Sequence, residues 1–587
     1  MPHGEEFSNT VLVKVNGTPL PDDVKPLLVG GYVDDSSNVP DLFVLRFSDE
    51  AGIVLQKAGA EIGAKVELSL QSTSPGGPAV LLAAEVTAIE VDISEAGVHT
   101  VVRGLDASHR LFRGTRIEAY VNMTASDIVR KVAQRVGLTC GTVDATTTTL
   151  EHTTQDNVND WDFLRRLGAE HDRLLTMSDG KLQFVSRTPA SEAPSGSAGA
   201  RNDPLVLERG VSLVNLRGTI TSDGQVQEVE VRGWDPEQKK EVVAKKEAAT
   251  ESAVPEGGIT PTALAAKFSA PPYVLGRASL AKQEEVTAVA TSLADHLAGG
   301  FAELEGTARG NPALRAGTAV QLVGVSAPFA GKYVLTSTRH EFAPEFGYRT
   351  LFSASNASER SLFGTAGAAA ARARPEVSGV VPAIVTSVQD PEHRGRVKIK
   401  LPWLADTYES WWARTVQPGA GEDRGAAVLP EVGDEVLVAF EQGDLGHPYI
   451  LGGLYNGKDM PHGGWAANVD GTSGKVVRRG LVSRTGMKVD FLEAAGSEAI
   501  EISSNDGAQK VVLTQTGSKG IEILSEGPLT VKAMQAVEVT TDTGNLKIKA
   551  VNVDIEAQAN LNLKAGVNAE LSGSALAAVK GALVKIN

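Results

Sequence analysis

The 587-residue chain is 42% hydrophobic and 22% charged, ordinary proportions for a soluble globular protein and enough for roughly three to five domains. Its formal net charge of -16 argues against nucleic-acid binding, because phosphate recognition needs a basic face, and its one cysteine, Cys140, excludes an intrachain disulfide framework. The first residues lack the apolar core of a signal peptide and no stretch approaches about 18 consecutive apolar residues, so we expect synthesis in the cytoplasm without a signal peptide and no stable membrane insertion.

Changes in composition and periodicity divide the chain into a series of predicted segments. Apolar residues alternate with polar ones along most of the chain, which is the period of strands, and helical spacing is confined to short stretches. In chain order the predicted segments are a β-barrel (1–118), a small α+β module (119–186), a linker (187–204), a second β-barrel with an insertion (205–361), a linker (362–376), a small OB-fold barrel (377–456), a connecting loop (457–480) and a repeat tail (481–587).

Turn and cap signals mark the elements of the N-terminal segments. Asn16-Gly17 between alternating stretches is a hairpin signal in the first barrel. In the α+β module, Thr124 to Asp127 can cap a helix that Gly137 ends, and a second helix is expected from about Asn159-Asp160. The predicted linker that follows the module is rich in Pro, Ser, Ala and Gly.

About five short strands separated by glycine turns are expected in the small barrel, a pattern that fits the OB fold. Such folds often bind nucleic acid through aromatic side chains, and Trp403, Trp411 and Trp412 are of that kind. The segment has no basic groove, however, and the whole chain is acidic. We therefore expect no nucleic-acid partner.

The tail from about Ala499 onward repeats a short unit of apolar, polar and apolar residues. Ile500-Glu501-Ile502 and Leu546-Lys547-Ile548 are two examples. The units recur roughly every eight to ten residues, with Gly, Asn, Asp or Ser between them. This pattern is typical of a strand-turn-strand repeat with one dry face and one wet face.

Each repeat unit has too little apolar bulk for a core of its own, and Phe491 is the one aromatic residue after Trp465. Burying one apolar side chain contributes roughly 1.5–3 kcal/mol, whereas ordering each residue costs roughly 1.5 kcal/mol. Three chains wound into a prism would share one core along a shaft on the order of 50 Å long. We therefore predict a mainly β fold: two β-barrels with the α+β module, the OB-fold barrel, and a triple-stranded β-helix formed by a homotrimer. A single-chain β-solenoid is the alternative for the tail.

A series of short motifs runs through the small barrel in a fixed order. They are Asp390-Pro391, Gly395-Arg396-Val397-Lys398, Leu401-Pro402-Trp403, Trp412-Ala413-Arg414, the stretch 429–436, Gly443-Asp444 and the stretch 448–456. Weaker motifs precede the barrel at 161–165, 231–236 and 331–333, the last leading to His340. In order and spacing, these motifs resemble the VgrG-type spike proteins of contractile injection systems, over nearly the full length of the chain.

The resemblance implies a homotrimer in which the N-terminal halves form a hub, the small barrels form a ring and the tails form a needle. It also implies inner tube and baseplate proteins, a PAAR-type tip protein and effector cargo as partners. The implied function is structural: the spike nucleates the baseplate and inner tube and punctures the target envelope. It would act as part of an assembled injection particle, whose release from the cell is left open.

No motif predicts an enzyme, a cofactor or a metal site. There is no Gly-x-Ser-x-Gly elbow, no His-Glu-x-x-His and no Walker loop, and the connecting loop is too short for a glycosidase domain. His340 is expected to be a structural or surface residue rather than a catalytic base, and Cys140 to be inert. Two alternatives stay open: a spike with cryptic peptidoglycan-hydrolase activity, and a trimeric glycan-binding tail adhesin.

The last residues of the sequence are apolar. Leu583, Val584 and Ile586, with the final Asn587, predict a blunt trimeric face on which a small tip protein docks. Ordinary strand core is the alternative interpretation of the same residues.

Overall fold

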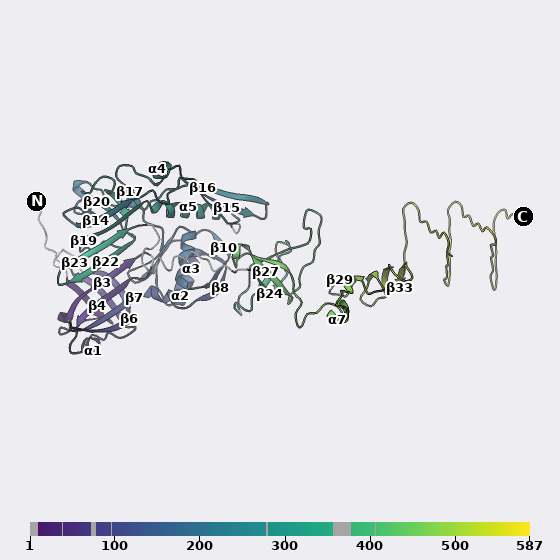
Figure 1. The fold of residues 1–587 in the computed structure, drawn as a ribbon, viewed down its shortest axis with the longest axis horizontal. Helices are drawn as coiled ribbons and strands as arrows, with labels where there is room; N and C mark the ends of the chain where they lie inside the picture. Colours follow the sequence, from purple (N-terminus) through teal and green to yellow (C-terminus); the bar gives the residue numbers. More distant parts are fainter. Residues whose placement is uncertain are drawn as a thin grey trace. The chain divides into compact units, whose positions relative to one another are not determined.

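Strands hold 40% of the residues and helices 13%, which confirms the mainly β fold. The structure, a computed structural model, describes residues 10–37, 39–71, 78–95, 97–277, 280–355, 377, 379–405 and 407–586. The predicted linker 362–376 lies outside the described residues. The chain forms two compact units, Met1–Asp459 and Met460–Asn587 (Figure 1).

One sheet of eleven strands dominates the first unit. At its middle, β3 pairs with β22, and Arg339 Nη2 donates to Asp34 Oδ2 across this pairing at 2.8 Å. The strands of both predicted barrels therefore share one sheet. In sheet order its strands are β14 (Leu213–Ile220), β19 (Ala302–Arg309), β23 (Gly347–Ala354), β22 (Ser337–Ala343), β3 (Leu28–Ser36), β4 (Leu42–Ser48), β7 (Gly97–Asp106), β6 (Ala79–Ser94), β5 (Lys65–Gln71), β1 (Thr10–Val15) and β2 (Thr18–Pro19).

Two apolar cores lie on this sheet. Phe43, Phe47 and Leu68 are central to the first core, which α1 (Val54–Ala58) covers with the buried Val54. Phe301 and Phe352 are central to the second. A four-stranded sheet completes the second core; its strands, in order, are β13 (Val206–Glu208), β20 (Ala319–Val323), β21 (Gly331–Val334) and β17 (Ala253–Pro255).

The α+β module begins where the predicted cap places it. Thr124 Oγ1 accepts a hydrogen bond from the backbone N–H of Asp127 and starts α2 (Ala125–Arg135), and Asn159 caps α3 (Asp160–Glu170) in the same way. Both helices bury an apolar face against a three-stranded sheet and a two-stranded ribbon. The sheet contains β11 (Leu174–Ser178), β12 (Lys181–Val185) and β9 (Cys140–Val143); the ribbon contains β8 (Arg116–Thr124) and β10 (Thr149–Val158).

The segment 187–204, predicted as a linker from its composition, packs against the four-stranded sheet. Ala190 is fully buried, and its N–H donates to the backbone oxygen of Glu251 at 2.7 Å. Lys332 Nζ donates to the backbone oxygens of Ser191 and Ala193, each at 2.7 Å. Small residues let this segment lie close to the sheet, so its composition reflects tight packing.

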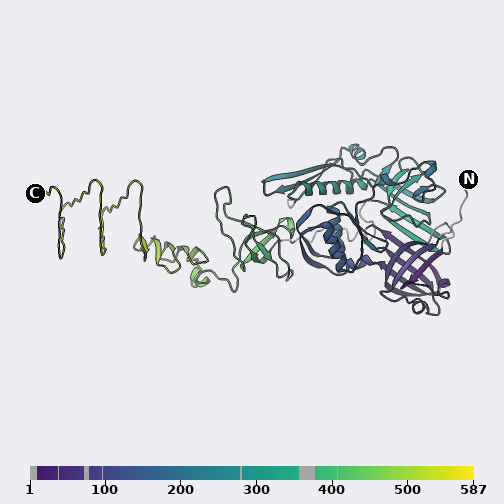
Figure 2. The same ribbon diagram turned by 180° about the vertical axis from the view of Figure 1, so that it is seen from behind.

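The predicted insertion of the second barrel is a small layer of its own. A sheet of β16 (Lys240–Glu247), β15 (Glu228–Asp235) and β18 (Tyr273–Gly276) is covered on one face by α5 (Gln283–Gly299) (Figure 2). Val229 and Val231 of the sheet pack against Val286 and Ala290 of the helix. A short helix, α4 (Pro261–Ala266), lies between β17 and β18 in the chain.

The small barrel contains one five-stranded sheet. In order its strands are β25 (Lys398–Lys400), β24 (Val380–Ser387), β27 (Glu435–Phe440), β28 (Pro448–Gly453) and β26 (Arg414–Thr415). Val385, Ile399, Val436 and Val438 are central to its core and are almost fully buried. They alternate along each strand with partly buried residues, the pattern expected of strands with one buried face.

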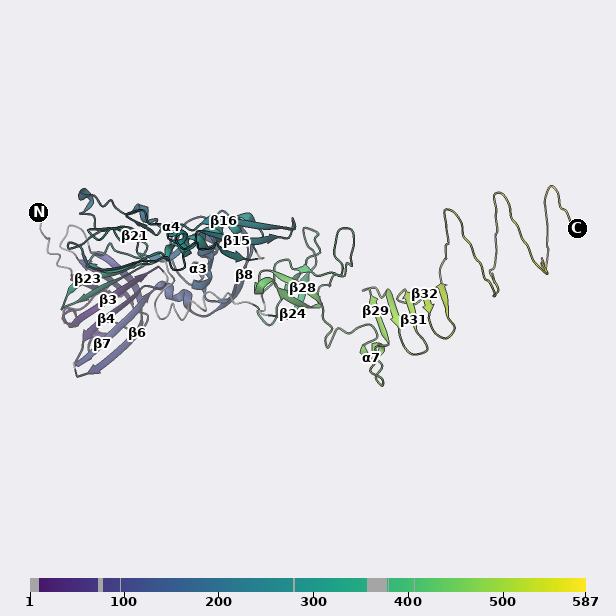
Figure 3. The same ribbon diagram turned by 45° about the horizontal axis from the view of Figure 1, so that its top comes forward.

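The second unit starts with a short helix, α7 (Trp465–Asn468), and an antiparallel meander. The meander contains β29 (Arg478–Val482), β30 (Lys488–Leu492), β31 (Ala499–Ser503), β32 (Gln509–Thr514) and β33 (Gly520–Ser525). Residues 526–586 are described but form no strand, although their sequence continues the same repeat (Figure 3). A strand needs hydrogen-bonded neighbours, and the single chain supplies none to these residues.

Candidate functional site

Asp390, which opens the motif series, organises the loop between β24 and β25. Its carboxylate accepts hydrogen bonds from the backbone N–H groups of Glu392, Arg394 and Arg396. The Arg396 side chain binds the same carboxylate, with Nη2 2.7 Å from Oδ1. The Arg396 side chain, aided by the backbone donors, holds the pKa of Asp390 well below its usual range, although burial opposes the shift. Gly395 has φ of 69°, a conformation that favours glycine, so this motif closes a tight loop.

The other barrel motifs divide between core and surface. Leu401, Ala413 and Val436 each belong to a motif and are fully buried in the barrel core. Other motif residues are large, apolar and exposed: Trp403 (49%), Leu429 (48%) and Val432 (60%). Burial accounts for the first group within one chain, whereas the side chains of the second group stay about half exposed.

The ribbon of β8 and β10 has two faces that contact different parts of the unit. Directly paired residues share a face, so Tyr120 with Thr153 and Glu118 with Gln155 point to one side. On that side Tyr120 packs in the module core, and burial raises the pKa of its hydroxyl to about 12. The opposite face carries Ile117, Ala119, His152, Thr154 and Asp156.

This opposite face meets the small barrel. Ile117 and Ala119 pack against the barrel core, and the His152 ring stacks on Trp411, with ring centroids 6.0 Å apart. We call this contact the joint; it comprises Ile117, Ala119, His152, Thr154 and Asp156 of the ribbon with Tyr408, Glu409, Trp411 and Asp444 of the barrel. No sequence pattern predicts the joint, because a single histidine at a strand position has no period or spacing.

The repeat tail exposes its apolar side chains along its whole described length. In 526–586 these side chains alternate with polar ones, and most are more than half exposed: Leu529, Val531, Val537, Val539, Leu546, Ile548, Val551, Val553, Ile555, Leu561, Leu563, Val567, Leu571, Leu576, Val579, Leu583 and Ile586. Isolated exposed apolar residues are ordinary, but a continuous apolar row of this length marks an interaction surface.

The residues predicted to dock a tip protein lie at the end of this row. Leu583 is 75% exposed, Val584 47% and Ile586 91%, and these side chains form no described cluster. Asn587 lies outside the described residues. The docking face therefore stays a prediction.

Two residues singled out in the sequence have structural surroundings. His340 is fully buried, its Nδ1 lies 2.7 Å from the Tyr348 hydroxyl, and burial lowers its pKa to about 3. Burial raises the pKa of the Cys140 thiol, and the charge of Arg130 opposes the shift only in part. A neutral, enclosed imidazole and a protonated thiol both agree with the structural roles expected of them.

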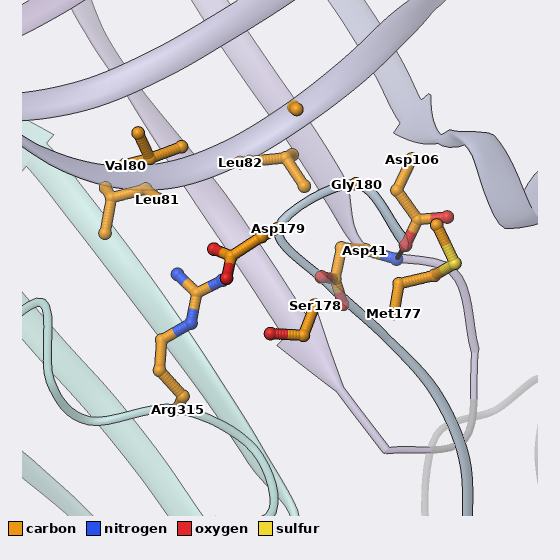
Figure 4. Close-up of a pocket in the computed structure, with 11 residues that line it drawn as sticks. Asp41, Val80, Leu81, Leu82, Asp106, Met177, Ser178, Asp179, Gly180 and Arg315 are labelled. Carbon is orange, nitrogen blue, oxygen red and sulfur yellow. Dashed lines mark hydrogen bonds between the residues drawn. The ribbon is translucent and has the colours of Figure 1, made fainter. Parts of the chain in front are cut away.

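A cavity of about 20 Å³, enough for one water molecule, lies between the first barrel and the β11–β12 turn (Figure 4). Asp41, Asp106 and Arg315 line it, and Arg315 also pairs with the buried Asp35, Nε to Oδ2, at 2.7 Å. Burial and the neighbouring carboxyls raise the pKa of Asp41 well above its ordinary value. Among the described residues no group of three or more His, Cys, Asp or Glu could hold a metal ion, and no helix is long and apolar enough to cross a membrane.

Comparison with protein families finds a match for the small barrel. Residues 381–455 match the family described as type VI secretion system/phage-baseplate injector OB domain. The Alg8 N-terminal domain family also matches residues 83–344, but the two ends of this match cut β6 and the hairpin of β22 and β23, so it follows no folding unit of the chain.

Curated relatives match over a short part of this chain. The type VI secretion system spike protein VgrG3 of Vibrio cholerae is 37% identical over 92 residues, which are 14% of this chain and 9% of the relative. The actin cross-linking toxin VgrG1 of Vibrio cholerae is 36% identical over 98 residues, 15% of this chain and 9% of the relative. This chain thus spans about a tenth of the length of these relatives.

Among solved structures, the half-lidded Francisella PdpA-VgrG complex covers 88% of this chain and 88% of its own, with a TM-score of 0.48 and 10% identity. The alignment covers most of both chains, but identity and TM-score are low, so the assignment rests on the barrel. Its motif order, strand pattern and family match all agree. The small barrel is therefore similar to the injector OB domain of type VI secretion systems and phage baseplates, and the match confirms that the chain resembles VgrG-type spike proteins.

Proposed function

We propose that three copies of this chain form the central spike of a contractile injection system. In this proposal the N-terminal halves form the hub, the injector OB domains form a ring, and the tails intertwine as a triple-stranded β-helix needle. The spike nucleates the baseplate and inner tube and punctures the target envelope. The division of the chain into the predicted segments is part of this proposal.

The observation that carries the proposal is the exposed apolar row of the tail. Val551, Val553 and Ile555 are 100%, 54% and 64% exposed, and Asn552 and Asp554 lie between them. Fully burying one such side chain contributes roughly 1.5–3 kcal/mol. Two further copies would cover the row and give residues 526–586 the neighbouring strands that one chain does not provide.

A single-chain solenoid fits this observation less well. In a solenoid each turn packs on the next turn of the same chain, so the apolar side chains would be buried without a partner. In the described tail, Leu561 is 55% exposed and Leu563 83%. A partner of the same sequence supplies an identical apolar row in the same register, which closes a symmetric core.

The proposed partners follow from the assembly. Inner tube and baseplate proteins would bind the hub, effector cargo would travel with the spike, and a PAAR-type tip protein would dock on Leu583, Val584, Ile586 and Asn587. The protein would act without catalysis of its own, and its rigidity would come from backbone ladders with no free edge. It would be made in the cytoplasm and would function in the assembled particle.

Native mass measurement of the purified full chain tests the proposal directly. The expected particle has three times the chain mass of 61.5 kDa, and its tail resists protease at nanomolar concentration. A monodisperse single copy with a protease-resistant tail would refute the trimer and with it the needle.

A further inference from the structure

The joint between the ribbon and the small barrel encloses an ionisable ring that forms no hydrogen bond of ordinary geometry among the described residues, although the backbone of Glu409 acts on it in favour of the charged form. Both ring nitrogens of His152 are shielded from solvent and lack a hydrogen-bond partner of ordinary geometry among the described residues. The ring instead stacks on Trp411, with an interplanar angle of 26°. A neutral imidazole tolerates this apolar contact, whereas a charged imidazolium without hydrogen bonds is costly to bury.

A second cation already occupies the same aromatic surface. Lys398 Nζ lies 5.7 Å from the centroid of the Trp411 ring and forms an ion pair with Glu409, with Nζ 3.0 Å from Oε2. The charge on Lys398 therefore opposes a charge on His152, and the charge of Glu409 favours it less strongly than Lys398 opposes it. Glu409 is itself paired with Lys398, so burial and the neighbouring cation outweigh this anion.

Other titratable groups face the joint from each element packed against it. Asp156 lies on the same ribbon face as His152. On the barrel, His447 Nδ1 lies 3.4 Å from Asp444 Oδ2, and the charges of Glu441 and of Glu285 on α5 also act on His447. Protonation of His447 or Asp156 favours the docked barrel, so these two groups act in the opposite sense to His152.

From these contacts we propose that the joint is an acid-sensitive latch, in which protonation of His152 releases the small barrel from the ribbon of β8 and β10. At neutral pH the uncharged ring stacks on Trp411 and the barrel stays docked. In acid, His152 gains a proton on a ring nitrogen and is better solvated by water than by the joint. The latch is a property of the single chain. Its use by a spike rests on the proposed function: there it would free the barrel and the needle from the hub in an acidic compartment.

The pH window follows from burial. Burial lowers the pKa of His152 from its ordinary value of 6.5 to about 4 in the docked form. A depressed histidine pKa means that docking has its full strength above about 6.5 and is weakened progressively as the pH falls toward 4. If His152 has its ordinary pKa in the released form, the equilibrium constant for opening of the joint rises about 20-fold between pH 7 and pH 5 through His152 alone.

Thiol labelling within the joint measures this opening. Thr154 is 8% exposed and lies on the joint face of β10, so Thr154→Cys in a Cys140→Ser background gives one thiol that reacts when the joint opens. The exposed Thr147, as Thr147→Cys in the same background, gives the reference rate at each pH. With a dipyridyl disulfide as the probe, we expect the ratio of the two rates to rise from pH 7 to pH 5, by less than the roughly 20-fold that His152 alone would give, because Asp156 and His447 act in the opposite sense.

Variants at His152 separate its effect from the opposing groups. His152→Phe retains the ring stack but cannot be protonated, so we expect its ratio to stay level or fall in acid, where Asp156 and His447 favour docking; His152→Gln provides the same comparison if the phenylalanine variant does not fold. His171→Phe, at a half-buried histidine that caps the C-terminus of α3 and is not part of the joint, should behave as the parent.

The parent, His152→Phe and His171→Phe, each with the same labelling substitutions, give the results that would overturn the latch. A parent ratio that does not rise in acid, a His152→Phe ratio that rises as much as the parent ratio, or a His171→Phe ratio that stays flat would each refute it. The labelling needs only the isolated chain, so a failure of the latch is distinguishable from a failure of the trimer in the native mass measurement.

Discussion

A carboxylate placed on the apolar row of the tail gives the sharpest test of the needle. Val553 is 54% exposed in the single chain and lies between Val551 and Ile555 on the same row. Asn552 is its immediate neighbour on the opposite face. The substitutions Val553→Asp and Asn552→Asp therefore add the same side chain one residue apart, on opposite sides of the proposed prism.

The magnitude follows from the area still exposed. Fully burying a valine contributes roughly 1.5–3 kcal/mol, so burying the remaining half contributes about 0.8–1.6 kcal/mol per copy and about 2–5 kcal/mol per trimer. Three carboxylates would also meet near the axis without cations, which adds to the cost. Asn552→Asp should stay within about 0.5 kcal/mol of the parent, as surface substitutions usually do.

Thermal unfolding and native mass measurement on the same samples read out this difference. We expect Val553→Asp to lower the temperature at which trimers dissociate and to shift the population toward monomers at nanomolar concentration, and Asn552→Asp to match the parent. Equal behaviour of the two variants would refute the interpretation of the row as a shared core.

Three further predictions address the tip, the motif loop and the buried carboxyls. Deleting Gly581–Asn587 should abolish co-purification of a tip protein and leave the trimer intact; retained binding would count against the docking face. Asp390→Ala should destabilise the small barrel by about 2–4 kcal/mol in urea unfolding, because a buried charge-assisted pair and the acceptor for three backbone N–H groups are lost, whereas Glu392→Ala on the exposed side of the loop should change it by less than about 1 kcal/mol. The raised pKa of Asp41 means that the folded protein, in which Asp41 is neutral, loses stability as the pH rises. Asp41→Asn should therefore raise the melting temperature at pH 7 more than at pH 4, and an equal gain at both pH values would contradict a raised pKa of Asp41.

Local signals in the sequence predicted the local structure well. The cap at Thr124 starts α2, and alternation predicted the strands of the small barrel. The motif at Asp390 is recognisable because its contacts join residues that lie within six positions of one another. Such features depend on neighbours along the chain, which is the information that a single sequence carries.

Features built from distant segments could not be predicted in this way. Neither β3 nor β22 carries a mark of its partner, so the joining of both predicted barrels in one sheet was not foreseen. Asp41, Asp106 and Arg315 meet around one cavity from three separate segments, and no motif connects them. The repeat pattern predicted strands beyond Ser525 that one chain does not form, because their partners would belong to other chains.

The pairing of β3 with β22 also governs how the protein can be made. About 300 residues separate the two strands, and synthesis at roughly 5–20 residues per second delays the second strand by about 15–60 seconds. Until then, one side of β3 offers unpaired backbone groups to any neighbouring nascent chain, which is a route to aggregation. The N-terminal strands therefore cannot complete their sheet during their own synthesis, and expression conditions that slow translation should lower the soluble yield of this chain.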